Sequence, residues 1–234
     1  MKTLQGVRHG LTAAMLALVG SALGQTGPAV YTTTATGGDW DAITWTSNPS
    51  LPGTIPGNHP MDVVDVSGKS GTFYLNGSRI VGSLGHNSHP APAIQQTNPG
   101  DTLTLNNPGS GSSQTLQAAA ISKGNGQIYY HVPIILGTNI FAIVSDSNGR
   151  ADLTKGLTDG GNGHSITKLG TGYLRLENSL AIGAAPQFGA LDISGGTVQW
   201  KPNLTNTPFA LSSFGSGPMK FNGGMFSLNL NNSV

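Results

Sequence analysis

Hydrophobic and polar positions alternate most clearly in residues 166–177, which read Ile-Thr-Lys-Leu-Gly-Thr-Gly-Tyr-Leu-Arg-Leu-Glu. Successive side chains of a strand point to opposite faces. Leu174 and Leu176 therefore fall on one face, and the residues between and around them fall on the other. Gly170 and Gly172 precede this run; both can take backbone angles that are closed to other residues, so they suit a tight corner. The pattern predicts a strand, a tight corner and a second strand whose leucines point inward.

Similar alternating runs recur along the chain. Strands are predicted at 127–132, 134–136 and 139–144, separated by Gly and Asn. Residues 191–198 and 219–226 both read strand, Gly-Gly corner, strand, and they lie 28 positions apart (221 − 193). A repeat of that length is typical of solenoid proteins. Residues 115–121 fit either a strand or one to two helical turns, and the pattern leaves that choice open.

The segment Thr167-Lys168-Leu169-Gly170-Thr171-Gly172, followed by alternating leucines, resembles the autotransporter-associated β-strand repeat of bacterial secreted proteins. The resemblance is sharp at 166–176 and extends from about 103 to 230. It implies an all-β fold, a right-handed single-stranded parallel β-helix, in keeping with the crossover rule. It also implies a structural or adhesive role at the cell surface, without catalysis. Cell-surface glycans or other surface proteins are the expected partners.

The N-terminal residues carry the features of a secretory signal peptide. Lys2 and Arg8 precede an apolar run at 11–20, and small residues lead to a predicted cleavage after Gly24. Removing 1–24 changes the formal charge from +1 to −1 (1 − 2). A chain so close to neutrality has no basic face for nucleic acid, and no later stretch is apolar enough to insert into a membrane. We expect a secreted or cell-surface protein.

The remaining chain divides into 25–100, a cap with the first rungs of the β-helix, and 101–234, the parallel β-helix itself. Trp40 and Trp45, followed by a Pro-rich loop and Asp-Val-Val, resemble the opening of secreted bacterial β-solenoids, in which such residues cover the first rung. Stacking on a sugar is the alternative role for both rings. The closing residues 228–234 end as another rung finishes, so we expect the solenoid to continue beyond Val234.

The composition allows little chemistry. The chain has 35 Gly and only 9% charged residues. It has no Cys, which excludes disulfides and thiolate metal sites within it. We expect no catalytic, cofactor-binding or metal-binding residues. The alternative is a polysaccharide lyase or hydrolase on the same scaffold. It resembles pectate lyases, in which aspartates gather around a cation beside a basic residue, and the candidates are Asp146, Asp152, Asp159, Arg150 and Arg175.

Two segments, 146–157 and 86–89, have weak similarity to metal-binding motifs. Residues 146–157 faintly resemble a calcium loop, but Arg150 stands where an oxygen ligand is needed and Leu157 where an acid closes the loop. His86 and His89 supply two imidazoles without a third ligand in view. Both segments are predicted to be ordinary polar loops.

Overall fold

The computed structural model describes residues 27–51, 54–86, 91–109, 119–177, 188–201 and 217–229. The predicted signal peptide, most of the ambiguous segment 115–121 and residues 230–234 lie outside these ranges. The described residues form strands, turns and irregular connections without any helix. Accordingly, no helix among them is long and apolar enough to cross a membrane.

The strands belong to three sheets. Sheet A contains, in spatial order, β3 (Trp45–Asn48), β1 (Val30–Thr33), β4 (Val63–Asp65), β7 (Ser83–His86), β10 (Ile121–Lys123), β13 (Ile140–Val144), β16 (Ile166–Leu169), β18 (Leu191–Ile193) and β20 (Met219–Phe221). Sheet B contains β2 (Gly38–Asp39), β5 (Thr72–Leu75), β8 (Ala93–Gln96), β11 (Gln127–His131), β14 (Arg150–Leu153), β17 (Tyr173–Glu177), β19 (Thr197–Lys201) and β21 (Met225–Leu228). Sheet C contains β6 (Arg79–Val81), β9 (Leu103–Leu105), β12 (Ile134–Leu136) and β15 (Leu157–Thr158).

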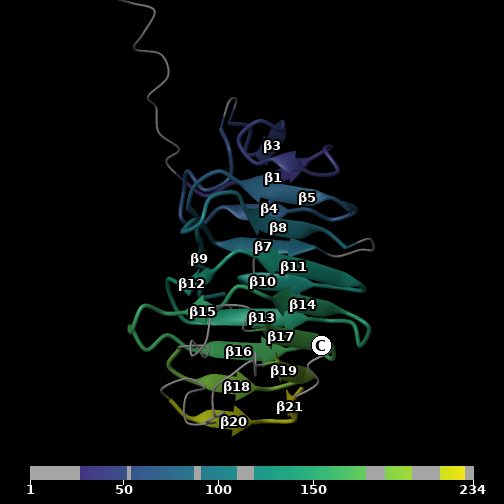
Figure 1. Ribbon diagram of the computed structural model, residues 1–234, viewed down its shortest axis with the longest axis vertical. Helices are drawn as coiled ribbons and strands as arrows, with labels where there is room; N and C mark the ends of the chain where they lie inside the picture. Colours follow the sequence, from purple (N-terminus) through teal and green to yellow (C-terminus); the bar gives the residue numbers. More distant parts are fainter. Residues whose placement is uncertain are drawn as a thin grey trace, which may run out of the picture.

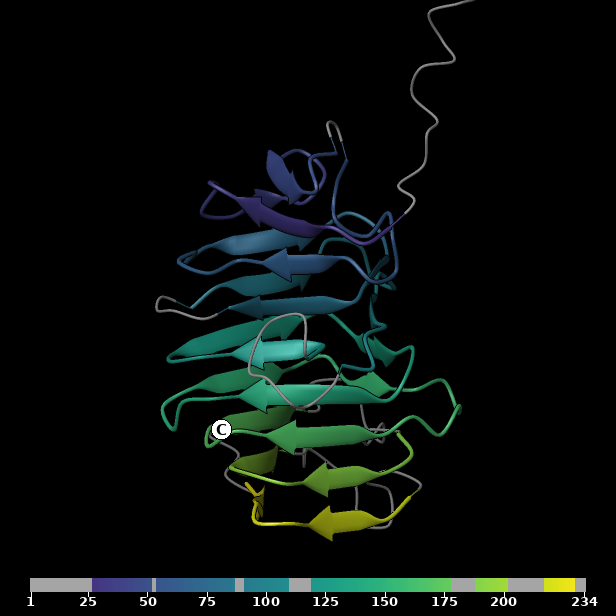
Figure 2. The same ribbon diagram turned by 180° about the vertical axis from the view of Figure 1, so that it is seen from behind.

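The chain winds from sheet A to sheet B, in the middle coils to sheet C, and back to sheet A one level further along. Inside each sheet, a strand pairs in parallel with the equivalent strands of the coils before and after it. Among the described strands, only β3 pairs antiparallel, with β1. Figure 1 shows the coils stacked along the long axis, from purple to yellow, and Figure 2 shows the same stack from behind. The predicted all-β parallel solenoid is confirmed.

The strands lie where alternation predicted them. β11, β12 and β13 match the runs predicted at 127–132, 134–136 and 139–144 within one residue. The two Gly-Gly segments occupy successive coils, because Leu191 pairs with Met219 and Thr197 pairs with Met225. The repeat of 28 residues is therefore one full coil at this point of the stack.

One continuous hydrophobic core fills the space between the sheets. Leu174 and Leu176 of β17 are buried, and Leu174 is paired with Ala151 of the preceding coil and Val198 of the next. Leu176 is paired with Leu153 and Trp200 in the same way. Like side chains thus stack in columns along the axis, so the predicted inward orientation of both leucines is confirmed.

The corner between β16 and β17 needs glycine for two different reasons. Gly170 has a φ of +76°, as predicted. Gly172 lies in the same corner but does not have a positive φ. A Cβ at Gly172 would lie 2.3 Å from the carbonyl oxygen of Asp146 in the preceding coil. Close stacking of successive corners, rather than an unusual backbone angle, therefore excludes a side chain there.

Two lysines point into the core at these corners, Lys123 of β10 and Lys168 of β16, and both are fully buried. The Lys168 ammonium donates to the carbonyl oxygens of Leu169 and Gly170 at 2.7 and 3.1 Å, and to that of Gly195 in the next coil at 3.3 Å. The Lys123 ammonium donates to the carbonyl of Asn125. Lys168, the lysine of the repeat, therefore joins one corner to the next through hydrogen bonds to their carbonyl groups.

Burial lowers the pKa of both lysines from 10.5 to about 8. The folded protein therefore releases these protons at lower pH than the unfolded chain, which binds more protons between about pH 8 and 10.5. Stability contributed by these groups rises with pH wherever the unfolded state binds more protons. We expect the free energy of unfolding to rise from pH 8 to pH 10, measured by urea denaturation.

Lys168→Met should remove about half of that rise, because Lys123 still titrates. The measurements end at pH 10 because burial raises the pKa of Tyr130. Above that pH the tyrosine ionises in the unfolded chain first, which lowers the free energy of unfolding and opposes the contribution of the lysines. Identical pH slopes for the two proteins would contradict a buried ammonium at Lys168.

Trp40 and Trp45 pack beside the first coils. Trp40 is fully buried, and its indole N–H donates to the carbonyl oxygen of Pro56 at 3.1 Å. The Trp45 indole N–H donates to the carbonyl oxygen of Trp40 at 2.8 Å. The two ring centroids lie 4.9 Å apart, and the Trp45 ring also lies 6.1 Å from that of Phe73. These contacts join the antiparallel strand β3 to the core.

Candidate functional site

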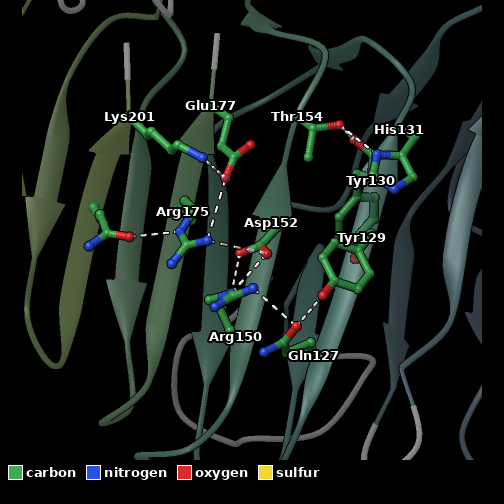
Figure 3. A network of polar contacts seen from close by, with 11 residues as sticks. Gln127, Tyr129, Tyr130, His131, Arg150, Asp152, Thr154, Arg175, Glu177 and Lys201 are labelled. Carbon is green, nitrogen blue, oxygen red and sulfur yellow. Dashed lines mark hydrogen bonds and ion pairs between the residues drawn. The ribbon is translucent and has the colours of Figure 1, made fainter. Parts of the chain in front are cut away.

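Polar side chains cross the outer face of sheet B over four successive coils. On β11, Ile128 and Tyr130 point into the core, so Gln127, Tyr129 and His131 point outward. The same alternation holds on β14, β17 and β19. Figure 3 shows the resulting network, which we call the sheet B ladder. It consists of Gln127, Tyr129, Arg150, Asp152, Arg175, Glu177 and Lys201, and of Gln199, which is bound to Arg175 and is not labelled in the figure.

The register of the parallel strands brings these residues together. Tyr129 is paired with Asp152, Asp152 with Arg175, and Arg175 with Gln199. Neighbouring strands of a sheet lie about 4.8 Å apart. Residues separated by more than 20 positions in the sequence therefore become adjacent on the surface.

Hydrogen bonds and ion pairs connect the ladder from end to end. Gln127 Oε1 accepts from the Tyr129 hydroxyl and from Arg150 Nη2, the latter at 3.0 Å. Arg150 Nε lies 2.8 Å from the Asp152 carboxylate.

Arg175 continues the network into the later coils. Its Nη1 lies 3.9 Å from Asp152 and 3.4 Å from Glu177, and its Nε donates to Gln199 Oε1 at 2.7 Å. Lys201 Nζ lies 3.9 Å from Glu177. The two arginines are held by carboxylate and amide oxygens, which orients their planar guanidinium groups on the surface.

Asp152 lies at the centre of the ladder. It is only 1% exposed because Arg150 and Arg175 cover it from both sides. Burial raises the pKa of the Asp152 carboxyl, although the two arginines act in the opposite direction. The carboxylate is engaged by its neighbours, so its chemical role in the ladder is to fix the arginines.

Aromatic rings flank the ladder. Tyr74 of β5 is 43% exposed and Tyr173 of β17 is 37% exposed. Tyr173 is paired with Arg150, which places this ring at the edge of the network. Tyr129 and His131 stack with ring centroids 5.5 Å apart and an interplanar angle of 12°. Exposed rings beside oriented hydrogen-bonding groups are suited to extended ligands that have both polar edges and apolar faces.

The five residues considered for lyase chemistry do not gather in one place. Asp152, Arg150 and Arg175 meet in the ladder. Asp146 lies at the corner between β13 and β14, and Asp159 follows β15 at the end of sheet C. Oδ1 of each of these two aspartates accepts a backbone N–H of its own turn at 2.8 Å, from Asn148 and Gly161 respectively. The structure thus separates the three carboxylates onto different parts of one coil.

The metal motifs also lack a converging set of ligands. Among the described residues, no three His, Cys, Asp or Glu side chains lie close enough to hold a metal ion. Arg150 turns toward Asp152 and Leu157 is buried, so neither completes a calcium loop. His89 and the side chain of His86 lie outside the described part of the chain.

The tryptophans offer little surface for stacking on sugars. Trp40 is fully buried and Trp45 is packed against the core, as described above. Among the described residues, the large exposed aromatic side chains are Tyr74 and Tyr173 of sheet B and Phe221 of β20. The two tyrosines lie on the same face as the ladder, and the sequence alone did not mark them as a binding surface.

The sequence contained a usable signal for the ladder. Gln127, Tyr129 and His131 occupy alternate positions of a run whose other positions are apolar. The same holds for Arg175, Glu177, Gln199 and Lys201 on later strands. What the sequence did not supply is the register that places these strands side by side.

A comparison of the chain with family models, curated proteins and solved structures finds no significant match.

Proposed function

We propose that this chain is a structural and adhesive segment of a secreted or cell-surface β-solenoid, and that the outer face of sheet B binds glycans without cleaving them. The scaffold is a stack of parallel coils whose long side is flat. The observation that carries the proposal is the sheet B ladder with its exposed tyrosines.

Glycans match this face better than other ligand classes do. Sugar rings present C–H faces that pack on aromatic rings, and hydroxyl groups that pair with amide, carboxylate and guanidinium groups. The ladder offers all of these groups in an open row. Four successive coils each contribute polar or aromatic groups to the same face, so a chain of sugars can make several weak contacts at once, which strengthens binding through effective concentration.

Binding without cleavage is supported by the state of the carboxylates. A glycosidase needs one carboxyl group as acid and a second as base or nucleophile on either side of the scissile bond. Asp152 is covered by two arginines, and Asp146 and Asp159 lie elsewhere on the coil. We include in this proposal that the protein is secreted. We also include that Trp40 and Trp45 form part of a cap on the first coil. The buried indole contacts and the antiparallel strand β3 at the edge of sheet A support the cap.

The test is binding of the purified protein to immobilised neutral and acidic polysaccharides, measured by biolayer interferometry. Tyr173→Ala should weaken binding about fivefold, because an aromatic contact contributes about 1 kcal/mol. Thr167→Ala, on the outer face of sheet A, is the matched control and should bind as the wild type does. Each incubated sample is also assayed for new reducing or unsaturated ends.

Two results would count against the proposal. Equal binding by wild type and Tyr173→Ala would remove the sheet B face as the binding surface. New reducing or unsaturated ends would favour the lyase or hydrolase alternative, and loss of that activity in Asp152→Ala would assign it to the ladder.

A further inference from the structure

A hollow lies beside the sheet B ladder, where three successive coils turn toward sheet C. The coil of β8 makes this turn over residues 97–102, and the coil of β14 makes it over 154–156. The coil of β11 lies between them and turns within 132–133. The shorter middle corner leaves a pocket of about 430 Å³, which we call the corner pocket, lined by Gln95, Gln96, Thr97, Pro99, His131 and Lys155. This volume is within the range of small-molecule sites.

His131 presents one defined nitrogen to the pocket. The Thr154 hydroxyl donates to the carbonyl oxygen of Tyr130 at 3.1 Å, and Thr154 Oγ1 lies 2.8 Å from His131 Nδ1. We assign the single hydroxyl proton to the bond with Tyr130, so that the Thr154 oxygen accepts from His131 Nδ1–H. This assigns the Nδ1–H tautomer to the neutral ring and leaves Nε2 as a hydrogen-bond acceptor. Stacking on Tyr129 fixes the plane of the ring.

The charged groups around His131 keep the ring neutral. Burial and the ammonium of Lys155 lower the pKa of His131, and Glu177 acts in the opposite direction with a smaller effect. A neutral imidazole accepts at Nε2, whereas an imidazolium only donates.

Two other polar groups of the pocket lack partners. Gln96 Oε1 is buried and accepts no hydrogen bond from any residue in the described ranges. The Lys155 side chain lines the pocket, and no ion pair joins it to an acidic side chain in the described part of the chain. A buried acceptor without a donor costs free energy that a suitable ligand recovers. The pocket thus combines two acceptors with one cation.

We propose that the corner pocket binds one acidic sugar residue, a hexuronate, whose carboxylate pairs with Lys155 and whose hydroxyl groups donate to His131 Nε2 and Gln96 Oε1. The ligand must carry an anion for the lysine and O–H donors for the two acceptors, and a sugar acid carries both. An ammonium ligand is disfavoured by Lys155, and a simple carboxylate such as acetate leaves both acceptors unpaired. The proposal deepens the glycan binding proposed above and rests on it.

The corner pocket adjoins the ladder, which explains how one glycan could use both. His131 lines the pocket and stacks on Tyr129, which belongs to the ladder. A polysaccharide lying across sheet B can therefore place one acidic residue in the pocket while the others contact the tyrosines and arginines.

The test is titration of the full chain with D-glucuronate and D-galacturonate, followed by nuclear magnetic resonance chemical shifts, with D-glucose, D-galactose and acetate as comparison ligands. One of the hexuronates should give saturable shifts at His131 and Lys155 and bind at least tenfold more tightly than its neutral sugar and than acetate. Oligomers of that hexuronate are titrated in parallel, and tighter binding of the oligomer than of the monomer would identify a polysaccharide as the source of the residue.

Two variants assign the contacts. Lys155→Met should weaken hexuronate binding about tenfold and leave neutral-sugar binding unchanged, whereas Lys220→Met, on the exposed face of β20, should change neither. His131→Phe keeps a ring against Tyr129 but removes the acceptor, and it should weaken binding of both sugars about fivefold. Circular dichroism and melting establish that each variant is folded, and Lys155→Gln provides a second substitution if Met perturbs the corner.

Unchanged hexuronate affinity in Lys155→Met and His131→Phe, or equal affinity for acetate, would overturn the corner-pocket proposal. The proposal that the sheet B face binds glycans is tested by different outcomes from those that test the corner pocket. Polysaccharide binding that depends on Tyr173 but is accompanied by no hexuronate binding would reject the pocket and leave the sheet B face. Hexuronate binding without any polysaccharide binding would reject the face as an adhesive surface.

Discussion

Replacing Leu174 with aspartate should unfold the coils around β17. The side chain is fully buried between Ala151 and Val198 of the adjacent coils, so the substitution removes a core leucine and introduces a carboxylate without a partner. Loss of a buried leucine alone costs about 2 to 5 kcal/mol, and an unpaired buried charge adds to it. We expect a loss of at least about 4 kcal/mol in the free energy of unfolding, measured by urea denaturation followed by circular dichroism.

Tyr173→Asp is the matched control for this variant. Tyr173 precedes Leu174 on the same strand but points outward, so we expect a change below about 1 kcal/mol. In a solenoid each coil contacts mainly its neighbours. Hydrogen exchange in Leu174→Asp should therefore accelerate first in β14, β17 and β19. Equal stability of the two variants would contradict the inward orientation of Leu174.

Replacing Gly170 with alanine should cause the second largest loss of stability. The φ of +76° is costly for any residue with a Cβ, and the added atom would lie 2.2 Å from the carbonyl oxygen of Val144. Strain from such a backbone angle costs about 1 to 3 kcal/mol. The contact with the preceding coil forces successive corners apart in addition. We expect a loss of about 3 kcal/mol or more in the free energy of unfolding by urea.

A Gly68→Ala variant distinguishes backbone strain from crowding between stacked corners. The φ of Gly68, +74°, is nearly the same, but nothing lies within 4 Å of a Cβ built there. Gly68→Ala should therefore lose only the free energy of backbone strain, about 1 kcal/mol, and the difference between the two variants measures the crowding at the stacked corners. Equal losses would mean that backbone strain alone explains the glycine at position 170.

The fold was predictable because the coils are short and locally patterned. The alternation of apolar and polar residues predicted the positions of β11, β12, β13 and β17 within one residue. The two Gly-Gly segments predicted a pair of successive coils 28 residues apart. These features depend only on the period of two in a strand and on the backbone freedom of glycine at corners. Both are local properties of the chain.

The interior lysines were not predictable from the pattern. A lysine in a Thr-Lys-x-Gly segment reads as an exposed residue, because a charged side chain is rarely buried without a partner. Lys168 is buried because its ammonium satisfies three carbonyl groups of two stacked corners. Those carbonyls meet only after the coils have stacked. The crowding at Gly172 was missed for the same reason.

The candidate site required the register between coils. From the sequence, Asp152, Arg150 and Arg175 are candidates for lyase chemistry, and only the pairing of β14 with β17 shows that they form one network. Gln199 and Lys201 join it through the pairing of β17 with β19. The spacing between successive coils varies with loop length, so no fixed repeat in the sequence predicts which residues face one another.

The outer face of sheet B is the proposed binding surface for glycans. The most direct test is a map of backbone amide shifts in the ¹⁵N-labelled protein, titrated with the polysaccharide that binds best in the interferometry panel. Binding on this face should concentrate the shifts in β11, β14, β17 and β19, with Tyr173 and Arg175 among the largest. Shifts confined to sheet A or to the end coils, or no shifts at saturating polysaccharide, would contradict it.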